Sequence, residues 1–249
     1  MENLPVEISE QILLNVSDAR AVIALAQVNT TFYSLYKRHE KELYHKLRIS
    51  KTKMTVPWVK CPGCGFYRSH QVEWYEFPEG VKHGTEICIR RNKILGKRKY
   101  RGGQLQGLQR RWSYLGRSSP KLLWEGYYER GVKNGFVRKF YEDGTLRNEM
   151  YYVDGYKHGQ YQEWWHVSEC KNKFVNLKVT GQYSHGQRSG EWLQLYPSQR
   201  LYKRKNYWDG LKHGPYEKWC ELFCIFRRYY LIHKGEYLYG RKVGVHTYY

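Results

Sequence analysis

Hydrophobic and polar residues follow two different patterns along this chain, and the change comes near residue 50. Within residues 8–16, apolar side chains recur at intervals of four, five and eight, a spacing that places them on one face of a helix. Two more apolar runs follow, over residues 19–28 and 32–47. The pattern therefore predicts three short helices, which together form a helical head over residues 1–48.

A glycine pattern replaces the helical one in the rest of the chain. An aromatic residue stands three positions before the first glycine of each copy, and a large apolar residue stands five positions after the second. Paired glycines supply positive φ, and aromatic residues suit a pleated surface, so each copy predicts a strand, a turn and a strand. The Gly-x-x-x-Gly spacing occurs at residues 80/84, 103/107, 131/135, 155/159, 186/190, 210/214 and 240/244.

The copies also show a longer period. Their intervals are alternately short and long (23, 28, 24, 31, 24 and 30 residues), and an extra glycine precedes the third, fifth and seventh copies at Gly126, Gly181 and Gly235. The building block is therefore interpreted as a pair of hairpins. Asp143-Gly144 additionally predicts a two-residue hairpin loop of type I′. Because an isolated hairpin is marginal in water, neighbouring copies are expected to stack.

The predicted fold class is α+β. It combines the three-helix head over residues 1–48 with an elongated all-β solenoid of seven β-hairpin repeats over residues 72–249. Residues 49–71 fit neither pattern and are interpreted as a linker, with Cys61-Pro-Gly-Cys64-Gly as a hinge. Cys61 and Cys64 are the candidate zinc ligands, but a structural zinc site needs four ligands. No metal and no cofactor are expected, and the alternative is a Gly-rich hinge with two thiols.

Charge is concentrated in the array. The first fifty residues hold six basic and six acidic side chains, so the remaining 37 basic and 17 acidic residues carry the net charge of +20. Such a surplus favours an anionic partner, which could be nucleic acid, acidic lipid or an acidic protein face, and it also raises solubility. The chain shows no signal peptide and no stretch of about 18 apolar residues, so a cytoplasmic location is expected.

Cationic residues and histidines recur just after the first glycine of most copies. A stacked array would align them along one edge, where they could bind phosphate groups with a steep salt dependence. The alternative is a solvated edge that keeps an aromatic-rich protein in solution. The candidate anion-binding or partner-binding residues are Lys82, His83, Lys133, Lys157, His158, Arg188, Lys212, His213 and Lys242.

No catalytic motif accompanies these residues. The chain has no G-x-S-x-G elbow, no phosphate loop that ends in Gly-Lys-Ser/Thr, and no H-E-x-x-H pair. Nucleic-acid binding is not expected, because most aromatic rings occupy the repeat-invariant positions that a core needs. The sequence therefore predicts a binding protein and not an enzyme.

The head carries a family resemblance. The pattern Leu4-Pro5-x-Glu7-Ile8-x-x-x-Ile12-Leu13, with Leu25-x-x-Val28-Asn29-x-x-Phe32-x-x-Leu35 after it, resembles an F-box motif. The resemblance implies docking to the Skp-type adaptor of a cullin ubiquitin ligase. It departs from the family at Asp18-Ala19, where an Asp-Leu pair is usual, and the alternative is that these residues only fold the head against the repeats. The residues that the resemblance implies as adaptor-binding are Leu4, Pro5, Ile8, Ile12 and Leu13.

The repeats carry a second resemblance. Residues 135–144 and 154–165 resemble MORN repeats of the antitoxin variant, in which an Asn/Asp-Gly turn alternates with the Gly-x-x-x-Gly turn. This resemblance implies β-hairpin solenoids that bind proteins, dimerise or lie on anionic phospholipid. The joined head and array are similar to F-box/MORN repeat proteins of Marseillevirus-like large DNA viruses, which implies the cytoplasm of a host cell.

The leading functional prediction is a non-catalytic adaptor that docks a Skp-type subunit through its head and binds a target protein through its array. The alternative is a structural or peripheral-membrane protein whose basic repeat edge binds anionic phospholipid or another acidic surface. The last copy stops at Tyr249, the position of its invariant apolar residue. An uncapped edge strand is a template for pairing, so self-association or target binding through residues 229–249 is also expected.

Overall fold

The computed structural model describes residues 5–16, 21–22, 25, 30–46, 50–56, 70–77, 80–114, 119–170, 176–221 and 229–249. The chain divides into two compact units, Met1–Arg111 and Trp112–Tyr249. The fold is mostly β with few helices, and every strand pairing is antiparallel. These features confirm the predicted β-hairpin architecture of the repeats at this level.

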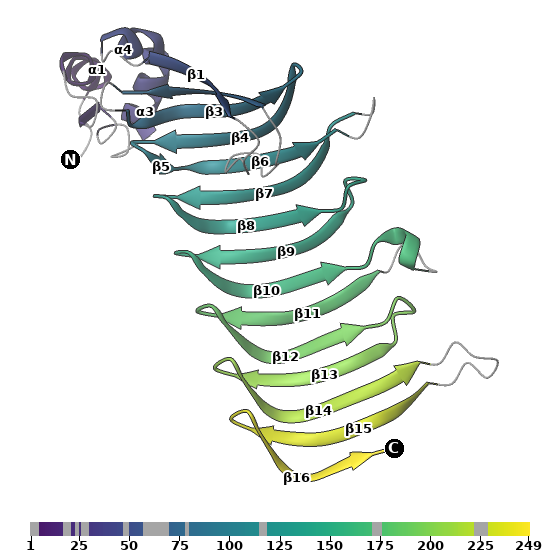
Figure 1. Ribbon diagram of the computed structural model, residues 1–249. Helices are drawn as coiled ribbons and strands as arrows, with labels where there is room; N and C mark the ends of the chain where they lie inside the picture. Colours follow the sequence, from purple (N-terminus) through teal and green to yellow (C-terminus); the bar gives the residue numbers. More distant parts are fainter. Residues whose placement is uncertain are drawn as a thin grey trace. The chain divides into compact units, whose positions relative to one another are not determined.

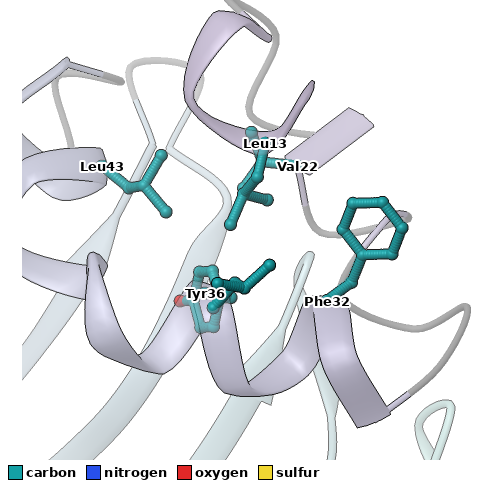
Figure 2. Packing of buried hydrophobic residues seen from close by; sticks show 6 residues of the cluster. Leu13, Val22, Phe32, Tyr36 and Leu43 are labelled. Carbon is teal, nitrogen blue, oxygen red and sulfur yellow. The ribbon is translucent and has the colours of Figure 1, made fainter. Parts of the chain in front are cut away.

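The helical head contains α1 (Val6–Asn15), α3 (Thr30–Arg38) and α4 (Glu40–Lys46). The third predicted helix is therefore two helices, which meet at His39. The second predicted helix lies largely outside the described residues. The side chains of the head pack around a core of their own, which Figure 2 shows: Leu13, Val22, Phe32, Leu35, Tyr36 and Leu43.

The described part of the first unit also contains five strands and most of a sixth, β6, and its long strands pair in sequence order. They are β1 (Ser50–Val56), β2 (His70–Glu76), β3 (Lys82–Arg90), β4 (Lys93–Arg101), β5 (Gln104–Leu105) and β6 (Gly107–Ser113). The prediction that residues 49–71 are a linker is wrong for β1, which pairs with β2 along its full length. Exposed lysines on β1 bind Glu73 of β2, so ion pairs hold a strand that has little apolar alternation.

The second unit continues the hairpins as ten strands in sequence order (Figure 1). A short 3-10 helix, η1 (Val167–Glu169), lies between the fourth and fifth of them. The strands are β7 (Lys121–Glu129), β8 (Val132–Phe140), β9 (Leu146–Val153), β10 (Tyr156–Trp164), β11 (Leu177–Ser184), β12 (Gln187–Leu195), β13 (Leu201–Trp208), β14 (Leu211–Glu221), β15 (Tyr229–Leu238) and β16 (Arg241–Tyr248).

The paired glycines have the backbone conformation that their spacing predicts. Both glycines of every pair have positive φ, from +64° to +119°. In the second unit the first glycine and the residue before it, such as Asp154-Gly155, both adopt positive φ and close a two-residue loop of type I′. The second glycine, such as Gly159, lies where the register of the hairpin shifts. One glycine therefore closes the hairpin, and the other allows a bulge.

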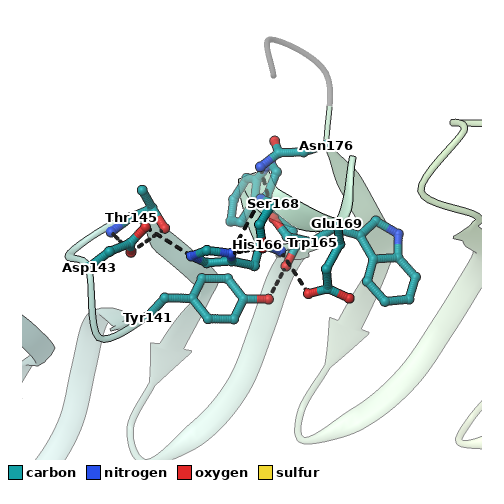
Figure 3. A network of polar contacts seen from close by, with 9 residues as sticks. Tyr141, Asp143, Thr145, Trp165, His166, Ser168, Glu169 and Asn176 are labelled. Atoms are coloured by element: carbon teal, nitrogen blue, oxygen red, sulfur yellow. Dashed lines mark hydrogen bonds and ion pairs between the residues drawn. The ribbon is translucent and has the colours of Figure 1, made fainter. Parts of the chain in front are cut away.

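The opposite ends of the hairpins repeat every 55 residues, which supports the doublet. The Tyr141 hydroxyl donates to the Trp164 carbonyl at 2.8 Å (Figure 3), and Tyr196 repeats this contact with Trp219 at 3.1 Å. Asp143 does not have positive φ, so the predicted type I′ loop there is wrong. Only Gly144 is left-handed, because hydrogen bonds between Tyr141 and Thr145 close a longer loop.

Two of the extra glycines make room for a ring on the neighbouring strand, and Gly126 makes room for the ring of Trp124 on its own strand. A Cβ on Gly181 would overlap the ring of Trp192, and a Cβ on Gly235 would overlap the ring of His246. Trp192 is buried and lies 5.6 Å from Tyr161, centroid to centroid, in a stacked arrangement. These glycines are therefore packing positions and not turn positions.

None of the helices in the described part of the chain has the length and apolar character needed to cross a membrane. The described residues also contain no group of three or more His, Cys, Asp or Glu side chains that could hold a metal ion. Cys61 and Cys64, the candidate zinc ligands, lie outside the described residues.

Candidate functional site

One face of the second unit carries three rows of side chains that cross the strands, and we call it the cationic face. Side chains of a strand alternate between the two faces of its sheet, so the pairing register assigns each residue to one of them. The register places every second residue of β8 to β14 on this face, for example Lys203, Lys205 and Tyr207 of β13. The opposite face receives Arg204 and Asn206.

The row nearest the type I′ loops alternates tyrosines and cations. Each cation lies over the invariant tyrosine of the next copy. The distances from the cation to the ring centroid are 4.8 Å for Lys133 and Tyr152, 4.7 Å for Lys157 and Tyr183, 5.4 Å for Arg188 and Tyr207, and 4.8 Å for Lys212 and Tyr237. This arrangement, the tyrosine–cation row, places a positive charge on every second strand.

The backbone fixes the same row. In each of the last four copies the N–H of the first glycine donates to the carbonyl of the cation in the preceding copy, as Gly186 does to Lys157 at 2.8 Å and Gly210 does to Arg188 at 3.0 Å. The cation side chain then covers the next tyrosine. Because both contacts recur, the spacing of the row does not depend on the unequal loops at the other ends of the hairpins.

The predicted lysine–histidine pairs do not form joint sites. Lys157 contacts Tyr183, whereas His158 contacts His185 at a ring distance of 5.5 Å. Lys212 and His213 diverge in the same way, because His213 lies 4.9 Å from the Tyr239 ring. Adjacent residues of a strand point to opposite faces, so the lysines and the histidines beside these loops lie on different faces of the sheet.

The predicted residues at the two ends of the array, the Lys82-His83 pair and Lys242, differ from the rest. In the first unit Lys82 covers Tyr100 at 5.6 Å, but the buried His83 shares a hydrogen bond of 2.7 Å with Tyr36 of the head. Burial lowers the pKa of His83 to about 4, with the Arg101 charge as a further cause. On β16 the exposed Lys242 turns to Tyr248 of its own strand and donates to its hydroxyl at 3.0 Å.

Four further lysines of the cationic face were missed by the sequence analysis. They lie away from the glycine turns. The register places Lys205 in a second row, beside the tyrosine–cation row, and Lys139, Lys203 and Lys218 in a third row beyond it. Counting back in steps of two from an invariant tyrosine would have found Lys203 and Lys205. The four residues are Lys139, Lys203, Lys205 and Lys218.

Three of these lysines, Lys139, Lys203 and Lys205, line a hollow of about 410 Å³ that spans β8 to β13. Its aromatic lining includes Tyr161, Trp192 and Tyr207, and its basic lining includes Lys205. Among the described residues that line it, Glu163 is the one carboxylate, and that group is already bound by the Tyr161 hydroxyl and by Lys178. The hollow is therefore aromatic and positively charged.

Lys205 shows the consequence of this imbalance. Its side chain is half-buried, and among the described residues no carboxylate pairs with it. Burial lowers the pKa of Lys205, and the charges of Lys203, Lys212 and Arg188 lower it further. A bound anion would relieve both effects, because it would supply the missing opposite charge.

The opposite face of the same strands carries balanced ion pairs. Arg138 of β8 binds Glu149 of β9 and lies 3.5 Å from Glu125 of β7. Arg204 of β13 lies 3.1 Å from Glu191 and 3.3 Å from Glu217. These cations already have their counter-charges, so this face has less to offer an anionic partner.

The first unit balances its own charge as well. At the position two residues after the second glycine it has Glu86, which is fully buried and bound by Lys82 and Arg98. The matching positions of the second unit hold Val137, Tyr161, Trp192, Tyr216 and His246. These positions of the second unit therefore supply no carboxylate to the cations of the tyrosine–cation row.

The head presents part of its predicted adaptor-binding set to solvent. Pro5 and Ile8 are exposed, with Ile8 at 45%. Ile12 is partly buried against the core, and Leu13 is fully buried within it. Leu13 is thus not available to an adaptor in this structure, because it holds the helices of the head together. Leu4 lies outside the described residues.

No protein-family model matches the chain, and no curated protein is similar to it at a significant level.

Proposed function

We propose that this protein is a non-catalytic scaffold that holds an acidic segment of a target protein on its cationic face and docks a Skp-type adaptor through its head. One observation carries the first half of the proposal. The cationic face has a series of half-buried cations with aromatic neighbours and one carboxylate in its hollow, whereas the opposite face of the same strands is balanced.

Electrostatics supports an acidic partner for this face. The ammonium groups of Lys157 and Lys212 lie over tyrosine rings, and these contacts hold them in place before a partner arrives. Less side-chain freedom then has to be lost on binding, which favours affinity. Charged patches of one sign also accelerate association with partners of the opposite sign, and added salt weakens this effect.

The acidic-partner proposal is tested with a poly-L-glutamate of defined length. We expect it to bind the full chain at low salt and to be released as salt is raised. Lys212→Gln should weaken binding about fivefold, which corresponds to about 1 kcal/mol. Lys234→Gln removes the same charge from the exposed, opposite side of β15 and serves as the matched control. Equal losses from both variants would contradict the proposal.

The adaptor half of the proposal rests on the F-box resemblance and on the exposed Pro5 and Ile8. Ile8→Asp changes an exposed side chain and should leave the head folded, because the core around Leu13 is untouched. We expect the purified Skp-type adaptor to bind the unchanged full chain and not to bind the Ile8→Asp variant. Tyr33→Asp, another exposed apolar position of the head, is the control. Full retention of Ile8→Asp would overturn the adaptor role.

Anionic phospholipid is the second candidate for the cationic face. The exposure of Arg188 and Lys242 favours a lipid partner. These two side chains can contact a membrane surface, which is too large to enter the hollow. Flotation with vesicles that contain or lack phosphatidylserine separates the two partners. A protein target predicts binding to poly-L-glutamate without flotation, and a lipid partner predicts flotation that depends on the anionic lipid.

Self-association through residues 229–249 also belongs to the proposal. Val245 is 86% exposed on β16, and Tyr248 and Tyr249 are 63% and 70% exposed. Light scattering over a range of concentrations should show an increase in mass that Val245→Lys reduces. A constant monomer mass at high concentration would contradict self-association.

A further inference from the structure

The tyrosine–cation row has a regular step that a partner can match. Its cations Lys133, Lys157, Arg188 and Lys212 stand on β8, β10, β12 and β14, so each step crosses two strands. Neighbouring strands lie about 4.8 Å apart, which makes the step about 9.6 Å. The row therefore offers positive charge at a nearly constant interval along the direction in which the hairpins stack.

The distance between successive cations of the row stays nearly constant although the copies differ in length. The first glycines of the last five copies are 24, 31, 24 and 30 residues apart. The extra residues lie at the other ends of the hairpins, in loops such as the one that contains η1. At the row itself, Gly155, Gly186, Gly210 and Gly240 make the same hydrogen bond to the preceding cation, at 2.7–3.0 Å. A ligand with negative groups at a constant spacing can thus match every cation of the row.

The chemistry of the row limits the ligand to an anion with apolar parts. Lys157 and Lys212 have no carboxylate partner among the described residues, and tyrosine rings alternate with them. Beside the row, the hollow adds Trp192 and the unpaired Lys205. Negative groups that face the cations, with compact apolar groups between them that pack on the rings, would fill this surface.

Of the regular conformations of a peptide, one fits the step. A polyproline II helix rises about 3.1 Å per residue with three residues per turn, so residues i and i+3 face the same side about 9.3 Å apart. In a β-strand, residues i and i+3 face opposite sides. In an α-helix the nearest equivalent, i and i+7, lies about 10.5 Å apart and drifts by about 1 Å at every step.

We propose, on the basis of the acidic-partner function above, that the cationic face binds an extended segment in the polyproline II conformation with a carboxylate at every third residue. The segment runs across β8 to β14, along the tyrosine–cation row. Its carboxylates meet Lys133, Lys157, Arg188 and Lys212, and the residues between them, of which proline is the best suited, pack on the tyrosine rings. Aromatic grooves recognise proline-rich segments because that conformation is already formed before binding.

The test compares labelled peptides of identical composition with the full-length protein. The phased peptide contains five Glu-Pro-Pro triplets. The first control peptide has the same five glutamates at alternating intervals of two and four residues, and the second has them in one block. We expect the phased peptide to bind at least tenfold more tightly than either control. An oligothymidylate of 15 nucleotides serves as the nucleic-acid probe and should bind more weakly than the phased peptide.

The outcomes separate this inference from the function on which it rests. If the three peptides bound with equal affinity, and salt weakened the binding of each, the phased segment would be overturned and the acidic-partner function would be retained. Failure of every peptide and of poly-L-glutamate to bind at low salt would overturn both. Tighter binding of the oligothymidylate would replace the peptide with a nucleic acid. A phased preference that Lys157→Gln with Lys212→Gln reduces at least fivefold, and Lys234→Gln leaves unchanged, would support the inference.

Discussion

The two faces of the second unit are built from the same strands, yet they treat charge in opposite ways. On one face, Arg138 lies between Glu149 and Glu125, and the hydrogen bond that the arginine donates to Glu149 is the main cause that raises its pKa. On the cationic face, burial and neighbouring cations lower the pKa of Lys205. Rows of paired opposite charges stabilise a sheet, whereas a half-buried cation without a counter-charge lowers the stability of the fold. The excess of cations on the cationic face is therefore explained if a partner supplies the counter-charge.

The largest expected effect tests what supports the cationic face. Gly181→Ala places a methyl group against the ring of Trp192. We expect it to lower the free energy of unfolding by about 2–3 kcal/mol, because the buried ring has no room to move. Urea denaturation followed by tryptophan fluorescence measures the change.

Gly190→Ala is the matched control for that substitution. Gly190 has a φ of +65°, and no atom lies within 4 Å of its added Cβ. The cost should be about 1 kcal/mol, from backbone strain alone. If the two variants were equally stable, Trp192 would not depend on the glycine beneath it.

The next effect separates the two faces by binding. Replacing Lys157, Arg188 and Lys212 together with glutamine should weaken binding of an acidic peptide about 100-fold, at about 1 kcal/mol for each charge. The slope of affinity against salt should fall as well. Arg138→Gln with Arg204→Gln removes two charges from the opposite face and should change affinity less than twofold. A comparable loss there would mean that net charge, and not the face, determines binding.

Removing one cation from each face should give smaller changes in the free energy of unfolding, and the two changes should have opposite signs. Arg204→Met leaves Glu191 and Glu217 without their partner and should cost about 1 kcal/mol. Lys205→Met removes a half-buried cation from three like charges and should increase stability by about 0.5 kcal/mol. Thermal denaturation of the two variants at pH 7 measures both changes. Destabilisation by Lys205→Met would show that the lysine has a favourable partner.

The smallest effect is the pH dependence of the Lys205 comparison. The pKa of Lys205 is lower in the folded than in the unfolded protein, whose lysines titrate near 10.5. The penalty of the charged form is therefore complete below the folded pKa and disappears as pH rises past the unfolded one. The advantage of Lys205→Met should shrink toward zero above about pH 10.5.

The repeat architecture was predictable, because each hairpin carries its own markers. The positive φ of paired residues such as Gly155 and Gly159 follows from the Gly-x-x-x-Gly spacing alone. Strand β1 was missed because its polar sequence lacks both the glycines and an apolar alternation, and its pairing depends on charges of β2. A pattern within a short stretch of sequence cannot reveal a strand that is stabilised by ion pairs with a strand farther along the chain.

The candidate site was predictable only in part. The sequence identified Lys157 and Lys212 as members of a periodic series, but it grouped them with histidines that contact other residues. Lys203-Arg204-Lys205 reads as one basic run, and only the strand register separates it into two lysines on the cationic face and one arginine on the other. Periodicity located the row, and pairing was needed to define the face.

The central claim, that the cationic face binds an acidic partner, is tested most directly by lysine acetylation of the full chain with and without the phased acidic peptide. Mass spectrometry then reports the modification of each lysine. The account predicts that Lys157, Lys205 and Lys212 are protected by the peptide at low salt and that the exposed Lys234 on the opposite face is not. Equal protection of Lys234, or no protection of the other three when the peptide is bound, would contradict it.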